Sequence, residues 1–292
     1  MPELPEVESI KLQLIKYLRD HKVVGVAANY KNLEGNPKNL VGGKFKTTRR
    51  FGKVLAIDFS NDYSLLAHIK LTGQFIYRGP NLKNPKLSKK IVGGVPGRHT
   101  FFTLKLNKNG FLYYNDVRRF GWLRIVKTKD VIRDKFVEKL GPEPLAEKTK
   151  SPLPKLTKEK FTEILSKTRR GLKVLLMDQS KIGGVGNIYA NDALWVARIH
   201  PERAANTLTE SETKVLFAAI EEVLLRGLKY GGASELAFVT PDGSEGEYQN
   251  FTTAYGKVDV PCQRPECKRK KSKFAKKMVG GRGTYFCKNC QK

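Results

Sequence analysis

The chain begins Met1-Pro-Glu-Leu-Pro-Glu-Val-Glu-Ser9, and this stretch starts the first element of the fold. Over residues 5–20 the apolar side chains recur every three or four positions, at Val7, Ile10, Leu14, Tyr17 and Leu18. That spacing predicts an amphipathic helix. A proline in the first turn and an acid such as Glu6 beside it are typical of a helix N-terminus. The sequence therefore predicts a helix whose N-terminal edge carries the first residues of the chain.

The second residue, Pro2, becomes the N-terminus when the initiator methionine is removed. An N-terminal proline is a secondary amine, and an α-amino group has a pKa of about 7.7 to 8.0, so a useful fraction is unprotonated at neutral pH. Attack of this amine on a sugar aldehyde carbon gives a cationic iminium, which is an electron sink for elimination. Glu3 is a candidate general acid and base. The alternative, which these residues alone leave open, is that the run only begins a helix.

After the helix the pattern changes to strands. The segments expected to form strands are Val23–Ala28, Lys44–Thr48, Val54–Phe59, Leu65–Ile69, Phe101–Leu106 and Phe111–Tyr114. They indicate a β-sandwich or flattened barrel in the first ~125 residues. Asn109-Gly110 is expected to make a hairpin turn. Residues 79–97 contain Pro, Gly and Lys, which favours a mobile surface loop.

The second half of the chain reads as helical. A linker is expected over residues 141–157, which carry four prolines. Helices are then predicted at Lys158–Lys167, Leu172–Gln179, Ile188–Ala197 and Glu210–Leu228. Between two of these lies a glycine-rich turn, residues 180–187, whose final Asn187 can cap the next helix. The glycines would let backbone N–H groups approach a phosphate, although a plain turn explains them as well. Residues 231–261 are polar and rich in glycine, and we interpret them as a long functional loop.

The charge of the chain indicates a polyanionic partner. There are 55 Lys and Arg against 28 Asp and Glu, a net charge of +27, and the pI is about 9.9. An excess of this size favours nucleic acid. No run of 18 apolar residues and no signal sequence with an apolar core is present, so no membrane association is expected. We expect a soluble, cytoplasmic protein.

All four cysteines lie near the end of the sequence, with the spacing C-x4-C-x19-C-x2-C at Cys262, Cys267, Cys287 and Cys290. Two close pairs separated by a hairpin-length spacer are typical of a structural zinc site. Two disulfides are the alternative, and nothing in the sequence indicates the secretion that they would need. Residues 262–292 also hold eleven Lys or Arg against one acid. The sequence thus predicts a small, basic, metal-stabilised hairpin that contacts phosphate.

Taken together, several motifs resemble one family. The chain resembles bacterial formamidopyrimidine-DNA glycosylase, which shares a superfamily with endonuclease VIII, essentially from end to end. The motifs that carry the resemblance are the MPELPEVE start, Arg50-Phe-Gly-Lys53, His68-Ile-Lys-Leu-Thr-Gly73, Asn115-Asp-Val-Arg-Arg-Phe-Gly121, Leu140-Gly-Pro-Glu-Pro144, Met177-Asp-Gln179, Gly186-Asn-Ile-Tyr-Ala190 and Gly281-Arg-Gly-Thr-Tyr-Phe-Cys-Lys-Asn-Cys290.

The resemblance implies an α+β multidomain fold. Its expected parts are an N-terminal helix and antiparallel β-sandwich forming a catalytic domain over residues 1–140, a linker over 141–157, a helix-two-turns-helix DNA-binding domain over 158–232, a lesion-recognition loop over 233–260 and a four-cysteine zinc finger hairpin over 261–292.

The implied activity is base excision repair of damaged double-stranded DNA, by excision of 8-oxoguanine and formamidopyrimidines followed by β,δ-elimination. The resemblance makes Pro2 the nucleophile, Glu3 the proton shuttle and Lys53 a phosphate ligand, with Glu6 supporting them. Because a damaged base has to leave the helix stack, the enzyme must fill the void. The implied DNA-binding residues are Leu71, Arg118 and Phe120 in that void and His68, Lys173, Asn187, Tyr255 and Arg282 on phosphates.

Two departures from the family pattern are visible. Leu71 stands where the family usually has methionine, and Thr72 where some relatives have glutamate, so the lesion preference is in question. The cysteine spacers are also longer than usual, which suggests an enlarged finger loop with its one structural Zn²⁺ retained. A monomer acting on duplex DNA is expected, with no organic cofactor.

Three other interpretations remain open at this point. One is an endonuclease VIII-like glycosylase for oxidised pyrimidines. Another is a catalytically idle DNA-binding or RNA-binding protein of the same fold, against which the combination of Pro2, Glu3 and Lys53 argues. The third, a ribosome-associated zinc-ribbon protein, accounts for the C-terminal segment only.

Overall fold

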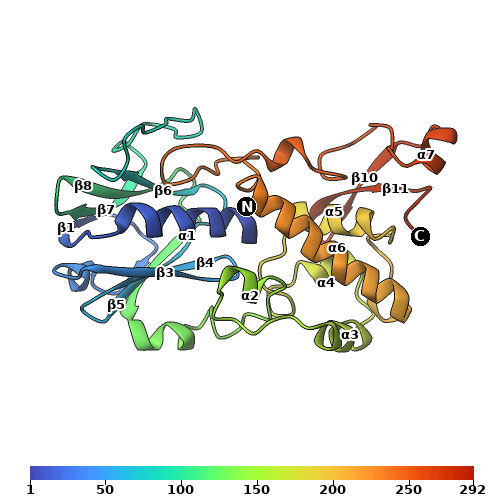
Figure 1. Ribbon diagram of the computed structural model, residues 1–292, viewed down its shortest axis with the longest axis horizontal. Coiled ribbons are helices and arrows are strands. Elements are labelled where there is room, and N and C mark those ends of the chain that lie inside the picture. Colours follow the sequence, from blue (N-terminus) through green and yellow to red (C-terminus); the bar gives the residue numbers. More distant parts are fainter. The chain divides into compact units, whose positions relative to one another are not determined.

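The structure is a computed structural model that describes residues 1–292. The chain divides into two compact units (Figure 1). The first unit comprises residues 1–139 and 227–249, and the second comprises residues 140–226 and 250–292. None of the helices combines the length and the apolar character needed to cross a lipid bilayer.

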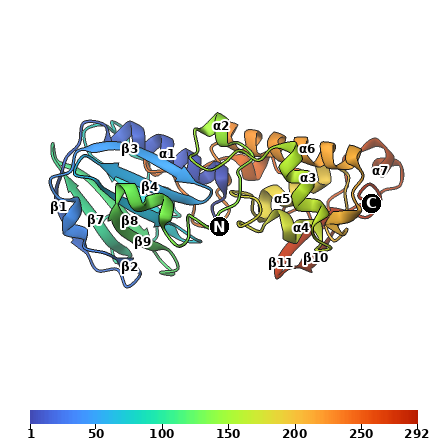
Figure 2. The ribbon, with the colours of Figure 1, turned by 90° about the horizontal axis from the view of Figure 1, so that it is seen from below.

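The first unit is a sandwich of two β-sheets (Figure 2). One sheet has the strand order β1-β7-β8-β6, formed by β1 (Val23–Ala28), β6 (Gly73–Arg78), β7 (Thr100–Leu106) and β8 (Gly110–Asp116). The other has the order β2-β9-β5-β4-β3, formed by β2 (Leu33–Glu34), β3 (Phe45–Phe51), β4 (Val54–Phe59), β5 (Tyr63–His68) and β9 (Trp122–Lys127). Neighbouring strands are antiparallel except for β2 and β9, which are parallel. The predicted antiparallel sandwich is confirmed.

Helix α1 (Leu4–Leu18) closes one side of this sandwich. It packs against β3 and β4 of one sheet and β6 of the other (Figure 1). Its apolar positions enter one core together with inward side chains of both sheets, and those from the helix are Val7, Ile10, Leu14, Tyr17 and Leu18. Each is at least 95% buried, so burial of this stripe, at about 25 cal/mol per Å² of apolar surface, is what holds the helix in place.

The structure differs from the predicted strands in three places. Strands β2, β6 and β9 were not expected. Strand β6 is buried on both of its faces, because Phe75 and Tyr77 face the main core while Ile76 lies in a second, smaller core on the outside. A strand covered on both faces has no alternation of apolar and polar residues to detect.

The turn between β7 and β8 is displaced by one residue from the predicted Asn109-Gly110. Its central residues are Lys108 and Asn109, both with φ of 56°, and the Gly110 N–H donates to the Asn107 carbonyl at 3.2 Å. Positive φ at both central positions is the type I′ geometry that matches the strand twist. Gly110 instead begins β8, where a Cβ would lie 2.8 Å from the His21 ring.

The connection between β6 and β7, residues 79–99, lies mostly on the surface, as its composition favoured, but it is anchored at several points. Ile91 is 8% exposed and belongs to the smaller core with Ile76, Tyr113 and Val239. Backbone hydrogen bonds join Lys86 and Ser88 to residues 242–243. The segment is therefore held at Lys86, Ser88 and Ile91 by backbone and apolar contacts that its own sequence does not reveal. This unit also contains the short 3-10 helices η1 (Pro37–Leu40) and η2 (Thr128–Arg133).

The second unit is mainly helical. Its elements are the helices α2 (Ala146–Thr149), α3 (Lys158–Ser166), α4 (Leu172–Leu176), α5 (Asn187–Val196), α6 (Glu210–Lys229) and α7 (Pro265–Arg269) and the 3-10 turn η3 (Ala205–Thr207). The last residues of the long α6 belong to the first unit, and a further 3-10 turn, η4 (Tyr248–Asn250), lies where the first unit ends. Residues 141–157, where a linker was expected, pack within this unit: Glu143 is fully buried, and the Gly183 N–H donates to the Pro142 carbonyl. The N-cap of α5 is Gly186, and Asn187 is the first helical residue.

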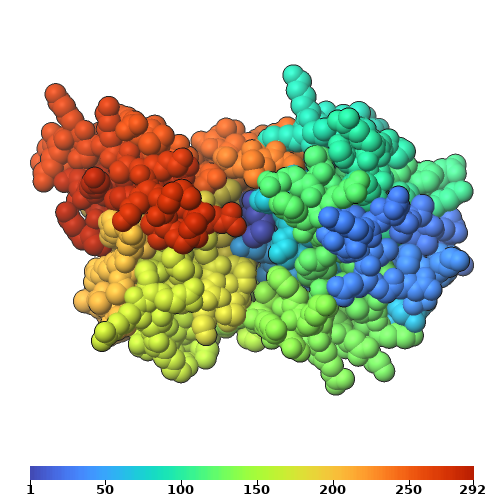
Figure 3. All heavy atoms as spheres, turned by 180° about the vertical axis from the view of Figure 1, so that it is seen from behind, coloured from blue at the N-terminus to red at the C-terminus, as the bar shows by residue number.

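The end of the chain folds around the four cysteines. Strands β10 (Phe274–Val279) and β11 (Arg282–Cys287) form an antiparallel hairpin, and the turn between them is Gly280-Gly281, with φ of 55° and 70°. The cysteines, Phe274 and Ala254 form a compact core against which Trp195 of α5 packs. Figure 3 shows the residues of this module, in red, exposed on one face of the second unit.

Candidate active site

The N-terminal end of α1 is built around two buried acids. Glu3 is the N-cap residue, 2% exposed, and Glu6 is 1% exposed. A carboxylate oxygen of Glu6 accepts the Glu3 backbone N–H at 2.7 Å, in the reciprocal arrangement of a capping box. Pro2 immediately precedes this box and is buried. The predicted nucleophile and proton shuttle therefore sit together at the N-terminal end of α1.

Glu6 also connects the helix to the loop that follows α6. Its second carboxylate oxygen accepts the Ala233 backbone N–H at 2.7 Å. At the preceding Gly232, φ is 86° and a Cβ would lie 2.7 Å from the Glu6 Cγ, so this approach requires glycine. Gly232 and Ala233 do not stand out in the sequence, yet through their contacts with Glu6 they join the start of α1 to the loop that begins at residue 231.

Lys53 is placed by a tight turn between β3 and β4. Gly52 has φ of 57°, and the pairing of Phe51 with Val54 makes Gly52-Lys53 a two-residue hairpin loop. The fully buried Arg50 donates to the Gly52 carbonyl at 2.9 Å and to Glu8 of α1 at 2.7 Å. A buried charge pair of this kind fixes geometry more than it adds stability. Arg50 thus holds the turn, and with it Lys53, against α1.

His68 lies at the end of β5 and is 3% exposed. Its Nδ1 accepts the Lys70 backbone N–H at 3.1 Å, which leaves the proton of the neutral ring on Nε2. Burial, with smaller contributions from Lys70 and Lys53, lowers the pKa of His68 well below its ordinary value. The imidazole is therefore neutral at physiological pH. It can contact a phosphate as a hydrogen-bond donor through Nε2, and not as a cation.

The loops predicted to fill the void meet at Thr72. The Thr72 hydroxyl donates to Asp116 at 2.5 Å and accepts the Arg118 backbone N–H at 3.0 Å. Asp116, fully buried, also accepts the Gly121 N–H at 2.8 Å. This fixes the base of the 117–121 loop, from which Phe120 projects with half of its surface exposed. The Arg118 guanidinium stacks over the Phe120 ring at 4.5 Å. Leu71, next to Thr72, is half-buried.

The Phe120 side chain leaves half of its apolar surface in water, where it gains nothing from burial. Isolated large apolar side chains on a surface are common, but this one projects from a loop next to the buried Asp116, which accepts hydrogen bonds from Gly121 of the loop and from the Thr72 and Tyr30 hydroxyls. The arrangement is suited to insertion into a base step.

In the second unit, helix α5 organises the predicted phosphate ligands. The fully buried Asp192 accepts the backbone N–H groups of Thr253, Ala254 and Tyr255 at 3.1, 2.8 and 2.9 Å. These bonds place the Tyr255 ring edge-on to the Tyr285 ring, with centroids 5.3 Å apart and an interplanar angle of 68°. Asp192 is thus a positioning residue for Tyr255, which the sequence-based analysis missed because an acid within a helix carries no distinguishing signal.

Two further residues connect α5 and α4 to the β10–β11 hairpin. Asn191 accepts the Tyr285 N–H at 2.7 Å and donates to the Asn187 carbonyl at 2.6 Å. Lys173, fully buried, donates to the Gly283 carbonyl at 2.8 Å and to Thr284 at 2.6 Å. Two of the three ammonium protons of Lys173 therefore bind the hairpin. Arg282, at the hairpin tip, is exposed.

The four cysteines fit a metal ion. Their sulfur atoms all lie within 4.8 Å of one another, and all four side chains are buried. The Cys262–Cys290 and Cys267–Cys287 sulfur separations are 3.9 and 3.7 Å, too long for disulfides. A tetrahedral ion with metal–sulfur bonds of about 2.3 Å requires sulfur atoms about 3.8 Å apart. The donor set and its geometry thus suit a four-coordinate thiolate metal site.

Two known domains match this sequence. The formamidopyrimidine-DNA glycosylase N-terminal domain matches residues 1–123, and the formamidopyrimidine-DNA glycosylase H2TH domain matches residues 140–238. Among curated proteins, a formamidopyrimidine-DNA glycosylase of Pediococcus pentosaceus is 34% identical, covering 100% of this chain and 99% of its own length. That of Pelotomaculum thermopropionicum is 35% identical with the same coverage.

Solved structures agree with these matches. A Lactococcus lactis Fpg variant in complex with Fapy-dG-containing DNA has a TM-score of 0.83 and 32% identity, covering 100% of both chains. MutM of Thermus thermophilus has a TM-score of 0.82 and 34% identity, covering 99% of this chain and 98% of its own. With both domains and the full length matched, this chain belongs to the formamidopyrimidine-DNA glycosylase family.

Proposed function

We propose that this protein is a base excision repair enzyme, a bifunctional DNA glycosylase and AP lyase that removes oxidised purines from duplex DNA and nicks the strand. The observation that carries the proposal is the N-terminus itself: Pro2 directly precedes a capping box whose two acids, Glu3 and Glu6, are buried at the start of α1. A protein that only binds DNA has no use for a secondary amine followed by a buried acid at this point.

In the proposed reaction the Pro2 nitrogen attacks C1′ of the damaged nucleotide. The bond from C1′ to the base breaks and the base departs with the proton that the amine gives up. The sugar ring then opens by cleavage of the bond from C1′ to O4′, with a proton added to O4′, and the iminium that remains is an electron sink. Glu3 donates a proton to the sugar oxygen or the base as cleavage begins and later shuttles protons in elimination. β-Elimination breaks the bond from C3′ to the phosphate oxygen, and δ-elimination breaks that at C5′. Glu6 holds Glu3 through its backbone N–H.

Access to C1′ requires the nucleotide to leave the stack, at a cost of a few kcal/mol. The 117–121 loop and Leu71 supply the compensating contacts. Phe120 enters the base step, Arg118 hydrogen-bonds the orphaned base, and Leu71, from the turn before β6, fills the remaining space. Lys53 and His68 contact the phosphates beside the lesion from this unit. In the proposal, the loop from residue 233 to 260 closes over the extruded base.

The second unit grips the backbone. Asn187 at the first turn of α5, Tyr255, and Arg282 at the hairpin tip are the proposed phosphate ligands, with Lys173 acting mainly through β11. The proposed metal is one Zn²⁺ held by the four cysteines, where it stabilises the hairpin and takes no part in catalysis, because four protein ligands close its coordination. Thiolate ligands suit a reducing compartment, so we place the protein in the cytoplasm, where it acts as a monomer on chromosomal DNA.

Oxidised pyrimidines are a second candidate substrate class. A solved structure similar to this chain, wild-type Lactococcus lactis Fpg, is a complex with DNA containing an oxidised pyrimidine; it has a TM-score of 0.82 and 33% identity. Thr72, in place of the glutamate of some relatives, is a further reason to measure both classes.

The test is borohydride trapping, which reduces the iminium to a stable protein–DNA adduct. Protein with a native N-terminus is mixed with a duplex holding 8-oxoguanine opposite cytosine, a thymine-glycol duplex and an undamaged duplex, with Pro2→Gly as the matched variant. We expect more adduct on the 8-oxoguanine duplex than on thymine glycol, and none on undamaged DNA. An uncleaved N-terminal extension should abolish trapping. Tight binding without any adduct would show instead a DNA-binding protein that has lost its chemistry.

A further inference from the structure

The β6–β7 connection, residues 79–99, lies against the loop that follows α6, residues 231–249. The two segments are joined through their backbones: the N–H groups of Lys86 and Ser88 donate to the carbonyls of Asp242 and Gly243 at 2.9 and 3.2 Å. At Gly243 a Cβ would lie 1.8 Å from the Lys86 carbonyl oxygen. Only glycine allows this approach, so the two segments are fitted to each other at this point.

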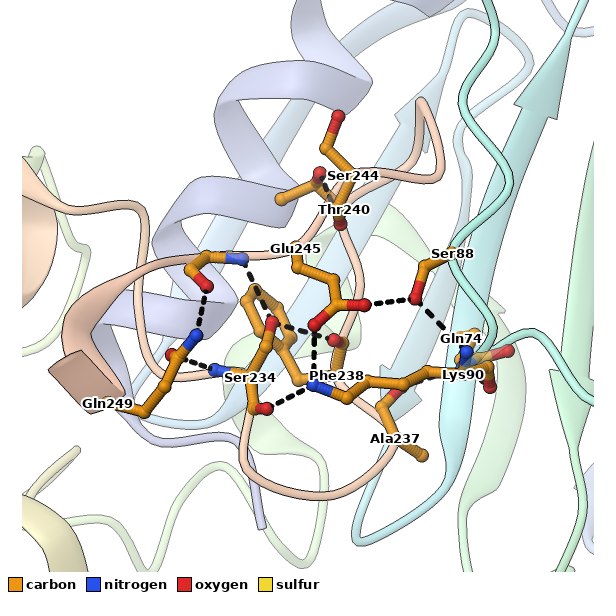
Figure 4. Close-up of polar contacts among 11 residues, drawn as sticks. Gln74, Ser88, Lys90, Ser234, Ala237, Phe238, Thr240, Ser244, Glu245 and Gln249 are labelled. Carbon is orange, nitrogen blue, oxygen red and sulfur yellow. Dashed lines mark hydrogen bonds and ion pairs between the residues drawn. The ribbon is translucent and has the colours of Figure 1, made fainter.

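A polar cluster adds to this pairing (Figure 4). Glu245 accepts the Ser88 hydroxyl at 2.5 Å through one carboxylate oxygen and the Lys90 ammonium at 2.5 Å through the other. The Lys90 ammonium also donates to the Ser234 carbonyl. The Lys90 ammonium therefore connects Ser234, near the start of the 231–249 loop, to Glu245, near its end.

Buried polar and apolar side chains next to this cluster also join the two segments. The Gln74 side-chain amide of β6, 2% exposed, donates to the Lys90 carbonyl at 2.9 Å and to the Ala237 carbonyl at 2.6 Å. One buried side chain thus serves both segments. Ile91 and Val239 meet in the small outer core. The contact between the segments is therefore a packed interface and more than a surface ion pair.

Most of the 231–249 loop is buried, and its exposed crest is formed by residues 235–236. Glu235 and Leu236 are exposed, Leu236 to 58%, and Ser234 is held through its hydroxyl by the Phe238 carbonyl and the Gly246 N–H, both at 2.9 Å. A loop with a free crest and fixed ends can present its crest in one orientation, which reduces the conformational entropy lost when a ligand binds.

We propose that residues 79–99 form a clasp that holds the 231–249 loop in its binding conformation, with Lys90 and Glu245 as positioning residues for recognition of the extruded base. This inference rests on the proposed function, because it assumes that the loop contacts the damaged base. The clasp therefore acts on base excision and not on cleavage of a site that has already lost its base.

The test compares Lys90→Met, Glu245→Gln and the charge exchange K90E/E245K with wild type. Lys89→Met is the matched control, because Lys89 is exposed and its loss lowers the net charge equally. The first measurement is amide hydrogen exchange of residues 234–246 in the free protein. The second is the single-turnover rate at saturating enzyme, on an 8-oxoguanine duplex and on a duplex with a preformed abasic site.

We expect exchange in the loop to rise about tenfold in both single variants, excision to slow about three- to tenfold, and cleavage of the abasic duplex to change less than about twofold. K90E/E245K should recover a large part of both losses, and Lys89→Met should match wild type. Unchanged exchange in Lys90→Met and Glu245→Gln would overturn the clasp. Raised exchange with unchanged excision would overturn its role in recognition. A wild-type protein that excises neither base class would contradict the proposed function, while the exchange data would still decide whether the clasp exists.

Discussion

Asp192→Asn should release the turn that carries Tyr255. The wild-type carboxylate accepts three backbone N–H groups, from Thr253, Ala254 and Tyr255, and is fully buried. Asparagine has nearly the same shape but a single acceptor oxygen, so its amide nitrogen must face at least one N–H. Losing that bond costs about 1–3 kcal/mol, and the two others lose the assistance of the charge, about 1 kcal/mol each.

The sum, about 3–5 kcal/mol, corresponds to a local opening equilibrium more favourable by about two orders of magnitude or more. Native-state hydrogen exchange of these three amides measures it directly, without assuming that a chain of two units unfolds in one step. Duplex binding should weaken about fivefold or more if Tyr255 contacts phosphate as proposed. Asp259→Asn is the control, because Asp259 is exposed in the same stretch and its φ of 59° suits asparagine. Wild-type exchange rates in Asp192→Asn would refute the reasoning.

Three further predictions concern pH, salt and metal. Burial holds the pKa of His68 well below its ordinary 6.5, so the folded state excludes a proton that the unfolded chain binds below that pH. Its contribution to stability is full above pH 6.5 and falls on acidification; in His68→Asn, the urea midpoint should decline less between pH 7 and 5.5 than in wild type. For Arg282→Ala, the log–log salt slope of duplex binding should become shallower by about 0.9 if one phosphate contact is lost, and an unchanged slope would exclude the contact. Cys290→Ser should lower zinc content and weaken duplex binding about tenfold or more, whereas full binding by the zinc-free protein would show that the hairpin is stable without metal.

Helix α1 could be predicted because its apolar residues follow the helical period, which is the signal that burial against a single core leaves in a sequence. It differs from its expected range by only one or two residues at each end. Strands β1 and β4 have the expected bounds, and β4, whose six residues are all buried, is predicted as a short apolar run and not by alternation. Strand β6 lacks alternation because the outer core covers its second face.

The candidate site was predictable only in part, and the physical reason is sequence distance. Pro2, Glu3 and the cysteines are visible because their chemistry depends on the residue type and on local spacing. Lys90 and Glu245 are 155 residues apart, and Asp192 and Tyr255 are 63 apart. In each pair both members belong to residue types that are common on a surface, so only the folded chain shows which of them meet.

The same geometry bears on the departure at Thr72. A threonine hydroxyl has one proton to donate, and here that proton is already given to Asp116, while one lone pair accepts the Arg118 N–H. Thr72 cannot donate to an extruded base without releasing Asp116. Asp116 in turn accepts the Gly121 N–H and so fixes the loop that carries Phe120. In the proposed function, selection of the base through a proton donated by Thr72 would therefore weaken the anchor of that loop. We expect base selection to depend instead on the 231–249 loop, whose orientation Lys90 and Glu245 fix.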